Sequence, residues 1–328
     1  MTRTFKRVAL AALGLALAAA TAGVPALSAE AYPGKPITFI VGYPPGGASD
    51  VISRLIAGHM QTKLGQPVVV KNQPGVNGNI ATEEVAKAAP DGYTLLLGTI
   101  ANAINASLIK GIRHDVNKDF IPVVQFMSSP SVLVVTPSLP VKTVDELVAL
   151  AKQKPGALTY ASTGSGSSPH LAGELFKLRT GTDLLHVPYK GAAPALTDVI
   201  AGHVQTGFKT ALSALPSMQD GSLRPLAVAD KERLPDLPDV PTMAEAGYPD
   251  FEVLSWNGIF VPAGTPDPVV QRLNETVNQI LADPEIAKRI RGMAGRPGGG
   301  TPEQFRALVQ AETEKWGEVI RKNGITQQ

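Results

Sequence analysis

Two glycine-rich segments carry the residues that could bind a charged group. The first, residues 41–50, reads VGYPPGGASD, and the second, residues 161–170, reads ASTGSGSSPH. Each follows an apolar run and precedes a helical pattern, so each predicts a turn between a strand and a helix. Glycines let the backbone approach a ligand, and the first N–H groups of a helix have no partner within the helix. Both turns are therefore candidate anion sites, with a glycine turn that holds no ligand as the alternative.

Neither segment matches a nucleotide-binding motif. Residues 164–169 begin as G-x-G-x-x-G but end in Pro169, and G-x-x-x-x-G-K-[ST] does not occur. The serines near His170 suggest a second class of function, a secreted esterase or hydrolase that uses Ser165 or Ser167 as its nucleophile. The chain lacks G-x-S-x-G, and serine close to histidine in sequence does not ensure hydrogen-bond geometry. We therefore expect a binding protein, not an enzyme, with no catalytic residues, and we treat His170 as an ordinary residue of a helix start.

Strand and helix patterns alternate along the chain, and these elements must position the two turns. Apolar runs at residues 37–41, 67–71 and 93–97 are typical of strands, and a second series begins at residues 132–135. Such alternation predicts parallel sheets covered by helices on both faces. An eight-unit barrel is one possible architecture. Two similar turns in separate halves favour the other, two doubly wound α/β lobes around a cleft.

Residues 1–29 have the composition of a secretory signal peptide. A basic start precedes the apolar, alanine-rich residues 8–22, and small residues follow, so we expect cleavage near Ala29 and a protein located outside the cytoplasm. The alternative is a membrane anchor, for which the apolar run is too short. Without these residues the formal net charge changes from +2 to −1, and no basic stripe remains. We therefore expect no binding to nucleic acid.

The residue types exclude several kinds of site. Cysteine is absent, which removes disulfides, thiolate metal sites and cysteine nucleophiles. The five histidines show no metal-binding spacing. We therefore expect no metal and no cofactor. The chain that would remain after cleavage is long enough for a substantial core and suits two domains.

Eight motifs occur in an order that resembles one protein family. They are YPGKPITFIVGYPPGGASD, NQPGVNGNIA, PDGYTLLLGT, YASTGSGSSPHLAGELF, HVPYKG, LRPLAVA, LPDVPTMAEAGY and WNGIFVPAGTP. From about Tyr32 to the C-terminus, the chain resembles the solute receptors of tripartite tricarboxylate transporters, the Bug proteins. The resemblance implies a type II periplasmic binding protein architecture, in which two α/β lobes close over a small organic carboxylate. It also implies delivery of the solute to membrane permease subunits, and we expect a monomer.

The same resemblance implies that each glycine-rich turn holds a ligand carboxylate through backbone N–H groups, hydroxyls and water. In the first turn the residues concerned are Tyr43, Gly46, Gly47, Ala48, Ser49 and Asp50. In the second turn they are Ser162, Thr163, Gly164, Ser165, Gly166 and Ser167. We expect a branched residue at position 47 to abolish binding, because it would fill the ligand's place and resist the required backbone angles.

Other polar residues are candidates with structural alternatives. Thr99 and Asn102 follow a strand end that should face the cleft, but the same side chains could cap a helix. Asp50 suits the positive end of a helix, yet it would repel a ligand anion at short range. Tyr189 could close the pocket, or it could pack with its hydroxyl satisfied.

The chain departs from the resembling family after residue 204. The family usually continues there with an acidic, apolar stretch that ends in Asp or Asn, whereas this chain reads QTGFKT. Lys209 follows an expected strand at residues 204–208, whose carboxyl end should face the cleft. We predict that Lys209 binds a second carboxylate, with a lysine that extends into solvent as the alternative. The departure leaves the identity of the solute open.

The expected strands also divide the chain into lobes. We place the crossings between lobes near residues 129–131 and 254–256, so that long C-terminal helices return to the first lobe. Trp256 should then lie beside the hinge instead of stacking on a ligand. The resulting organisation is a signal peptide at residues 1–29, lobe 1 at residues 30–130 plus 255–328, and lobe 2 at residues 131–254.

Overall fold

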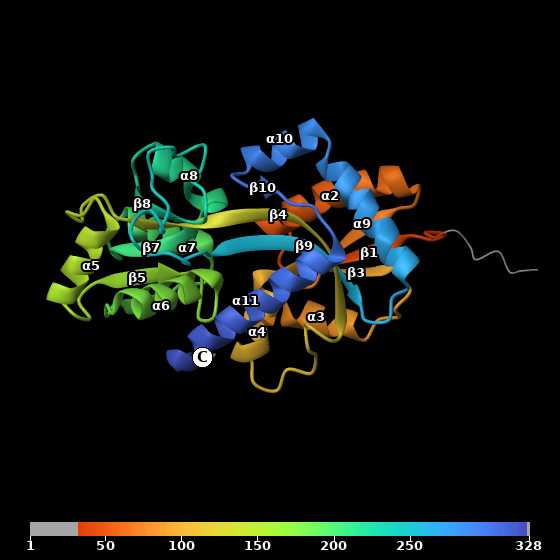
Figure 1. Cartoon of the computed structure of the whole chain (residues 1–328), viewed down its shortest axis with the longest axis horizontal. Coiled ribbons are helices and arrows are strands. Elements are labelled where there is room, and N and C mark those ends of the chain that lie inside the picture. The colour runs from red at the N-terminus through yellow and green to blue at the C-terminus, as the bar shows by residue number, and fades with distance from the viewer. Residues whose placement is uncertain (1–31, 327–328) are drawn as a thin grey trace, which may run out of the picture. The chain divides into compact units, whose positions relative to one another are not determined.

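The computed structural model describes residues 32–326 (Figure 1). The expected signal peptide at residues 1–29 lies outside the described residues. From Lys35 onward the described chain forms one compact unit. Among residues 32–326, no helix has both the length and the apolar character that crossing a membrane requires.

One portion of the sheet, which we call sheet A, is built around β1, a run of β-branched and aromatic residues that is almost entirely buried. Its strands are β1 (Ile37–Val41), β2 (Val68–Asn72), β3 (Thr94–Thr99), β9 (Leu254–Pro262), β10 (Arg296–Pro297) and the first part of β4 (Phe120–Val135). β1 pairs in parallel with β2 and β3, as successive strand–helix units should. β9 lies between β3 and β4 and is antiparallel to both.

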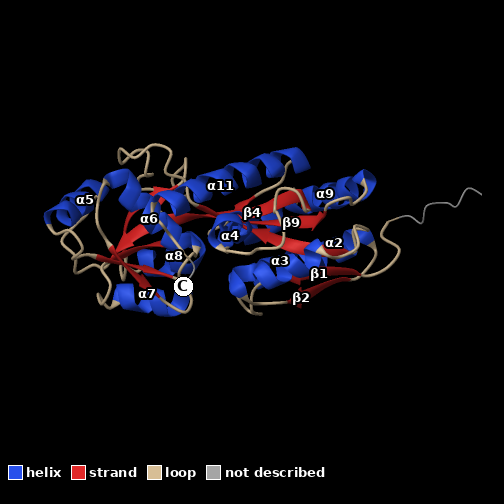
Figure 2. Cartoon of the chain, turned by 90° about the horizontal axis from the view of Figure 1, so that it is seen from below, coloured by secondary structure: helices blue, strands red, loops and turns tan. Residues whose placement is uncertain are grey.

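Helices cover both faces of sheet A. They are α2 (Ala48–Leu64), α3 (Asn79–Ala86), α4 (Ile100–Leu108), α9 (Asp267–Leu281), α10 (Pro284–Gly292) and α11 (Pro302–Lys322), with a short 3₁₀ turn, η2 (Val76–Gly78), before α3. α2 contacts α9 on one face, and α11 contacts α4 on the other. Figure 1 shows the strands between these two groups of helices, and Figure 2 gives the view from below, from the side of α3 and α4. α2 ends at Gly65, whose φ of 72° lets its N–H bond the Gln61 carbonyl oxygen.

The second portion, sheet B, repeats the strand–helix pattern. Its strands are β5 (Thr159–Ser162), β6 (Leu185–Pro188), β7 (Thr206–Thr210), β8 (Arg224–Ala229) and the last part of β4, and its helices are α5 (Val144–Gln153), α6 (Ser168–Thr180), α7 (Ala192–Ile200) and α8 (Ala211–Gln219). β5 pairs in parallel with β6 and β7, whereas β7 and β8 are antiparallel to β4. α5 begins with a capping interaction in which the Glu146 N–H donates to Thr143 Oγ1 at 3.1 Å.

β4 belongs to both sheets. Up to Pro130 it pairs with β9, and from Ser131 onward it pairs with β7 and β8. The change of partner falls within the segment where a crossing was expected. The lobes and their bounds nevertheless stay a prediction, because the described chain from Lys35 onward is one unit.

The strand order corrects two expectations. The sheets are mixed, since the crossing strands β4 and β9 run antiparallel to their neighbours, whereas the sequence pattern predicted parallel sheets. The eight-unit barrel is wrong, because the strand order runs open from β2 to β6. The α/β fold class itself is confirmed.

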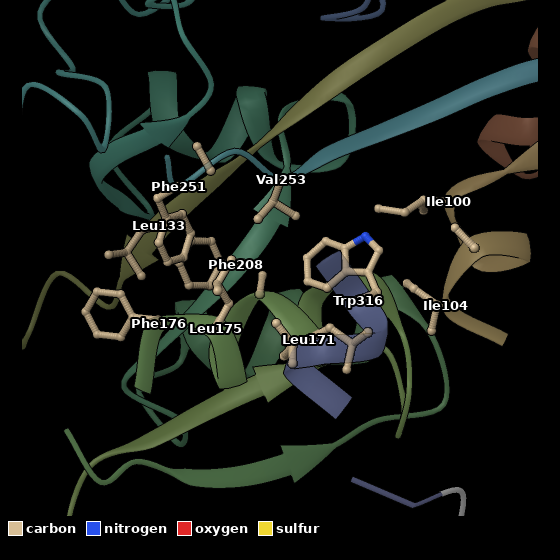
Figure 3. Close-up of a cluster of buried hydrophobic side chains, with 14 of the residues drawn as sticks. Ile100, Ile104, Leu133, Leu171, Leu175, Phe176, Phe208, Phe251, Val253 and Trp316 are labelled. Atoms are coloured by element: carbon tan, nitrogen blue, oxygen red, sulfur yellow. The ribbon is translucent and has the colours of Figure 1, made fainter. Parts of the chain in front are cut away.

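A continuous hydrophobic core joins elements of the two sheets. Figure 3 shows Trp316 of α11 between Ile104 of α4 and Leu171 of α6. The indole N–H of Trp316 donates to Glu312 Oε2 at 2.7 Å, so the buried ring has its polar atom satisfied. The C-terminal helix therefore packs on helices that follow strands of both sheets.

Candidate functional site

A cavity of about 250 Å³ lies between sheet A and sheet B. The parallel strands β1, β3, β5 and β7 end beside it, and the helix that follows each strand begins there. The carboxyl ends of strands are where open α/β sheets bind ligands. The cavity is therefore the candidate binding site.

Among the described residues, five helices begin at the wall of this cavity. The lining residues Ala48, Ile100, Ser168 and Ala192 open α2, α4, α6 and α7, and Leu212 is the second residue of α8. The first N–H groups of a helix lack intrahelical partners and carry partial positive charge. Two of these helix starts were expected from the glycine-rich turns. Their convergence with three others makes a site suited to an anion.

The cavity wall combines hydroxyl and amide side chains with apolar ones and carries almost no charge. Lys209 is the only charged side chain among the described lining residues, and neither Asp nor Glu is among them. A carboxylate in this cavity would meet helix ends and an ammonium group without a negative side chain in the wall. Within residues 32–326, no group of three acidic or histidine side chains is placed to hold a metal ion.

Asp50 shapes the first turn. Its carboxylate accepts hydrogen bonds from the Gly46 N–H at 2.9 Å, from Arg54 Nε at 3.0 Å and from Asn72 Nδ2 at 2.8 Å. The bond from Arg54 is the largest influence that lowers the pKa of Asp50 to about 2. Asp50 is buried and does not line the cavity. The structure thus places it as a residue that holds the turn.

The two glycines of this turn differ in conformation. Gly46 has a φ of 81°, in the left-handed region that favours glycine, whereas Gly47 is extended, with a φ of −77° and a ψ of 167°. A Cβ at position 47 would meet only the Pro44 carbonyl oxygen, at 3.6 Å. The expectation that position 47 requires special backbone angles is therefore wrong. Neither glycine lines the cavity, whereas Ala48 and Ser49 do.

Tyr43 and Thr99 line the cavity side by side. Their hydroxyl oxygens lie 3.0 Å apart in a hydrogen bond, and burial raises the pKa of Tyr43. Asn102 does not line the cavity. Its Oδ1 accepts the Thr99 N–H at 2.8 Å, and its Nδ2 donates to Thr82 Oγ1 at 2.9 Å. The capping alternative therefore describes Asn102, and Thr99, the N-cap residue of the same capping box, also belongs to the wall.

The second turn presents Thr163 and Ser167 to the cavity. Its members that do not line the cavity are Ser162, Gly164, Ser165 and Gly166. Gly166 has a φ of 76°, and a Cβ there would collide with the side chain of Leu108. Leu108 ends α4, so the second turn packs directly on a helix of sheet A.

Two histidines support the second turn. His170 Nδ1 accepts the Gly166 N–H at 2.9 Å, and His186 Nε2 lies 2.6 Å from Ser162 Oγ. Their rings stack with centroids 3.9 Å apart. Burial lowers the pKa of both histidines, that of His186 to about 4. The neutral state is the one that the Gly166 bond requires, since an accepting ring nitrogen carries no proton.

The serine contacts do not support the esterase alternative. Ser167 Oγ donates to the Gly164 carbonyl oxygen at 2.7 Å. Within the described chain, no histidine hydrogen-bonds to Ser165 or Ser167, so neither hydroxyl has a base in place to activate it. The serine that does contact a histidine is Ser162, which is 0% exposed and lies outside the cavity wall.

Tyr189 and Trp256 lie outside the cavity wall. The Tyr189 hydroxyl donates to Asp198 Oδ2 at 2.5 Å, and burial together with this carboxylate raises the pKa of Tyr189 to about 12. Trp256 is fully buried in β9, where its ring centroid lies 5.4 Å from that of Phe305. Trp256 therefore packs within the fold, and Tyr189 is partly buried with its hydroxyl satisfied.

Lys209 lies within β7, not after the strand as expected. Its side chain lines the cavity and the residue is only 3% exposed. The alternative of a lysine that extends into solvent is wrong. Whether its ammonium contacts the ligand stays a prediction, as do the other assigned ligand contacts.

Several lining residues were not predicted from the sequence. Ser129 and Met127 come from β4, Asn257 from β9 and Asn77 from η2. Ser49 Oγ donates to Asn257 Oδ1 at 3.3 Å, which ties the start of α2 to a crossing strand. Ser129, Met127 and Asn257 reach the cavity only through the strand order, so no local motif could have identified them. The glycine-rich loop around Asn77 was the one available signal.

Comparison with known proteins shows the family. Residues 52–325 match the family described as the tripartite tricarboxylate transporter family receptor. Protein BugT of Bordetella pertussis is 39% identical over 318 residues, an alignment that covers 96% of this chain and 97% of BugT.

Solved structures of similar proteins agree with this match. Rpa4515 of R. palustris, solved with adipate, has a TM-score of 0.80 at 38% identity and covers 90% of this chain and 100% of its own. The periplasmic binding protein BugD has a TM-score of 0.77 at 33% identity, with coverages of 90% and 100%. MatC from Rhodopseudomonas palustris, with bound malate, has a TM-score of 0.75 at 32% identity, with coverages of 88% and 100%. These neighbours are solute-binding receptors and not enzymes, and the chain belongs to the tripartite tricarboxylate transporter receptor family, of the Bug type.

Proposed function

We propose that this chain is a periplasmic receptor that captures a small organic carboxylate in the cavity and delivers it to a membrane transporter. The observation that carries the proposal is the cavity itself, where, among the described residues, five helix starts and one ammonium group converge and no acidic side chain lines the wall. Helix N-termini bind anions through fixed backbone donors, without the cost of burying many charged side chains. The adipate and malate in the structures of two relatives support the same chemistry.

The ligand contacts in this proposal come from residues that line the cavity. One carboxylate binds at the starts of α2 and α4, where the N–H groups and side chains of the lining residues provide donors. The residues proposed to touch the ligand are Tyr43, Ala48, Ser49, Thr99, Thr163, Ser167 and Lys209. The other predicted members act through the shape of the turns and of the wall: Gly46, Gly47, Asp50, Asn102, Ser162, Gly164, Ser165, Gly166 and Tyr189.

Transport and location complete the proposal. The signal peptide is cleaved near Ala29, and the mature protein acts as a periplasmic monomer that docks on the permease subunits of a tripartite tricarboxylate-type transporter. The two predicted lobes, residues 30–130 plus 255–328 and residues 131–254, close when one ligand contacts both. A ligand can shift such an equilibrium only through its higher affinity for the closed form.

Substitution at Ala48 tests the proposed function. Ala48 is exposed and lines the cavity, so Ala48→Leu should fill the anion site at the start of α2 without disturbing the core. Val51, one turn further along α2, is 48% exposed and does not line the cavity, which makes Val51→Leu a matched control. Titration calorimetry with adipate and malate should show binding to the wild type and to Val51→Leu, and at least tenfold weaker binding to Ala48→Leu. Binding of neither acid to the wild type, or equal affinities in all three proteins, would contradict the proposal.

A further inference from the structure

Lys209 occupies an unusual position for a lysine. It lies in the interior of sheet B, paired opposite Val132 of β4, and only 3% of the residue is exposed. The exposed part borders the cavity, since Lys209 is one of its lining residues. A lysine normally buries its stem and keeps its ammonium group in water.

The surroundings of the ammonium group leave it short of partners. Nζ donates to the Ala195 carbonyl oxygen at 3.2 Å, whereas an ammonium group has three protons to donate. None of the ion pairs formed by the described residues includes Lys209. Nζ also lies beside Gly207, where a Cβ would stand at an ordinary contact distance of 3.5 Å, and this neighbour has no side chain that could accept a hydrogen bond.

Burial without a counter-ion disfavours the charged form of this amine. Desolvation is the cause that lowers the pKa of Lys209, to about 8. The elements that pack on β7 carry other titratable groups: Asp198 on α7, Tyr160 on β5, and His170, Glu174, Lys177 and Arg179 on α6. Asp198 bonds Tyr189, and Glu174 bonds Tyr160 and Lys177, so both carboxylates have partners elsewhere. Lys209 therefore remains the cation at the wall that lacks a negative partner.

The site has a second feature that suits an incoming anion. α7 and α8 both begin at the cavity wall on the side of sheet B, as does α6. Ser168, the first residue of α6, has a buried hydroxyl oxygen without a hydrogen-bond partner in the described structure. These donors belong to sheet B, whereas Ala48 and Ser49 at the start of α2 belong to sheet A.

We infer that Lys209 forms a second anion subsite that selects solutes with two carboxylates, one held at the start of α2 and the other paired with the Lys209 ammonium. The inference rests on the proposed function and adds the substrate class, a dicarboxylate. An ion pair formed by the ligand supplies the negative partner that the protein does not provide. A solute with one carboxylate leaves one of the two subsites empty.

Paired acids of equal chain length test the inference. Titration calorimetry at pH 7 compares adipate with hexanoate on the wild type, on Lys209→Met and on Lys152→Met. Lys152 lies in α5, is exposed and does not line the cavity, so its substitution controls for the loss of one positive charge. We expect the wild type and Lys152→Met to prefer adipate at least tenfold. Lys209→Met should lose 10- to 100-fold in adipate affinity and change little for hexanoate.

Proton uptake provides a second readout that a purely structural lysine would not change. At pH 8, near the pKa of the free amine, pairing with a carboxylate should take up as much as about half a proton per adipate. Calorimetry in two buffers of different ionisation enthalpy measures this uptake, which should vanish in Lys209→Met. If the wild type binds neither acid, the proposed function fails and the inference fails with it. If the wild type binds adipate and Lys209→Met retains both the preference and the proton uptake, only the inference is overturned.

Discussion

The buried charge of Lys209 should reduce the stability of the ligand-free protein. Burial lowers the pKa of this lysine from 10.5 to about 8. Each unit of pKa corresponds to about 1.4 kcal/mol, so keeping Lys209 charged at pH 7 costs about 3 kcal/mol of folding free energy. Methionine has a similar length and no charge, so Lys209→Met should raise the free energy of unfolding by about 2–3 kcal/mol at pH 7.

The sign of the pH dependence follows from the two pKa values. Between pH 8 and pH 10.5 the unfolded chain holds a proton on this lysine that the folded chain has lost. The stability of the wild type therefore rises with pH across this window, because the unfolded state binds more protons. Lys209→Met has no such proton. Its advantage should be fully present below pH 8 and should shrink to about 1 kcal/mol or less by pH 10.

Urea unfolding of both proteins at pH 7 and pH 10 measures this difference directly. Other groups also titrate between these pH values, but they are common to the two proteins and cancel in the comparison. An equal or lower free energy of unfolding for Lys209→Met at pH 7 would refute the reasoning. An advantage of the variant that stays the same at pH 10 would refute the assignment of that advantage to the charge.

Two further predictions concern the turns. Because burial lowers the pKa of His186 to about 4 and also lowers that of His170, unfolding takes up protons as the pH falls below about 6.5. The wild type should lose stability between pH 6.5 and pH 4, and a His186→Gln variant whose acid unfolding follows the same curve would contradict this origin. In the first turn, Gly46→Ala should destabilise the protein by about 1 kcal/mol because of the positive φ of Gly46, whereas Gly47→Ala should be nearly neutral. Thermal unfolding of the two variants measures this difference, and equal losses of stability at the two positions would contradict the prediction.

Local patterns were sufficient to predict the two turns and much of the secondary structure. The runs around residues 37–41 and 158–163 were identified as strands followed by glycine turns and helices, since β-branched residues, glycines and helix starts are all local signals. The same signals indicated long C-terminal helices, and the structure has α9 and α11 in that part of the chain. The helix α10 was not predicted. The starts of α7 and α8 were not predicted to form part of the site.

Long-range pairing accounts for most of what could not be predicted. The wall residues Ser129 and Asn257 reach the cavity because β4 and β9 pair across sheet A, and nothing in either segment reveals its partner. His186 supports the second turn from a neighbouring strand, a contact that spacing along the chain does not encode. For Lys209 the residue type suggested a charged contact, but its burial follows from the pairing of β7 with β4 and the packing of α7 on β7.

The position of β9 between β3 and β4 favours an order of folding in which sheet A is completed last. Every strand of sheet B lies between β4 and β9 in the sequence or is β4 itself, so sheet B can form before β9 is available. Sheet A can form only in part, because β1, β2 and β3 pair with one another but β3 is joined to β4 only through β9. That closure joins distant parts of the chain and is expected to be the slow step. A chain that ends before residue 254 would leave the inner edges of β3 and β4 unpaired, and unpaired strand edges are templates for aggregation.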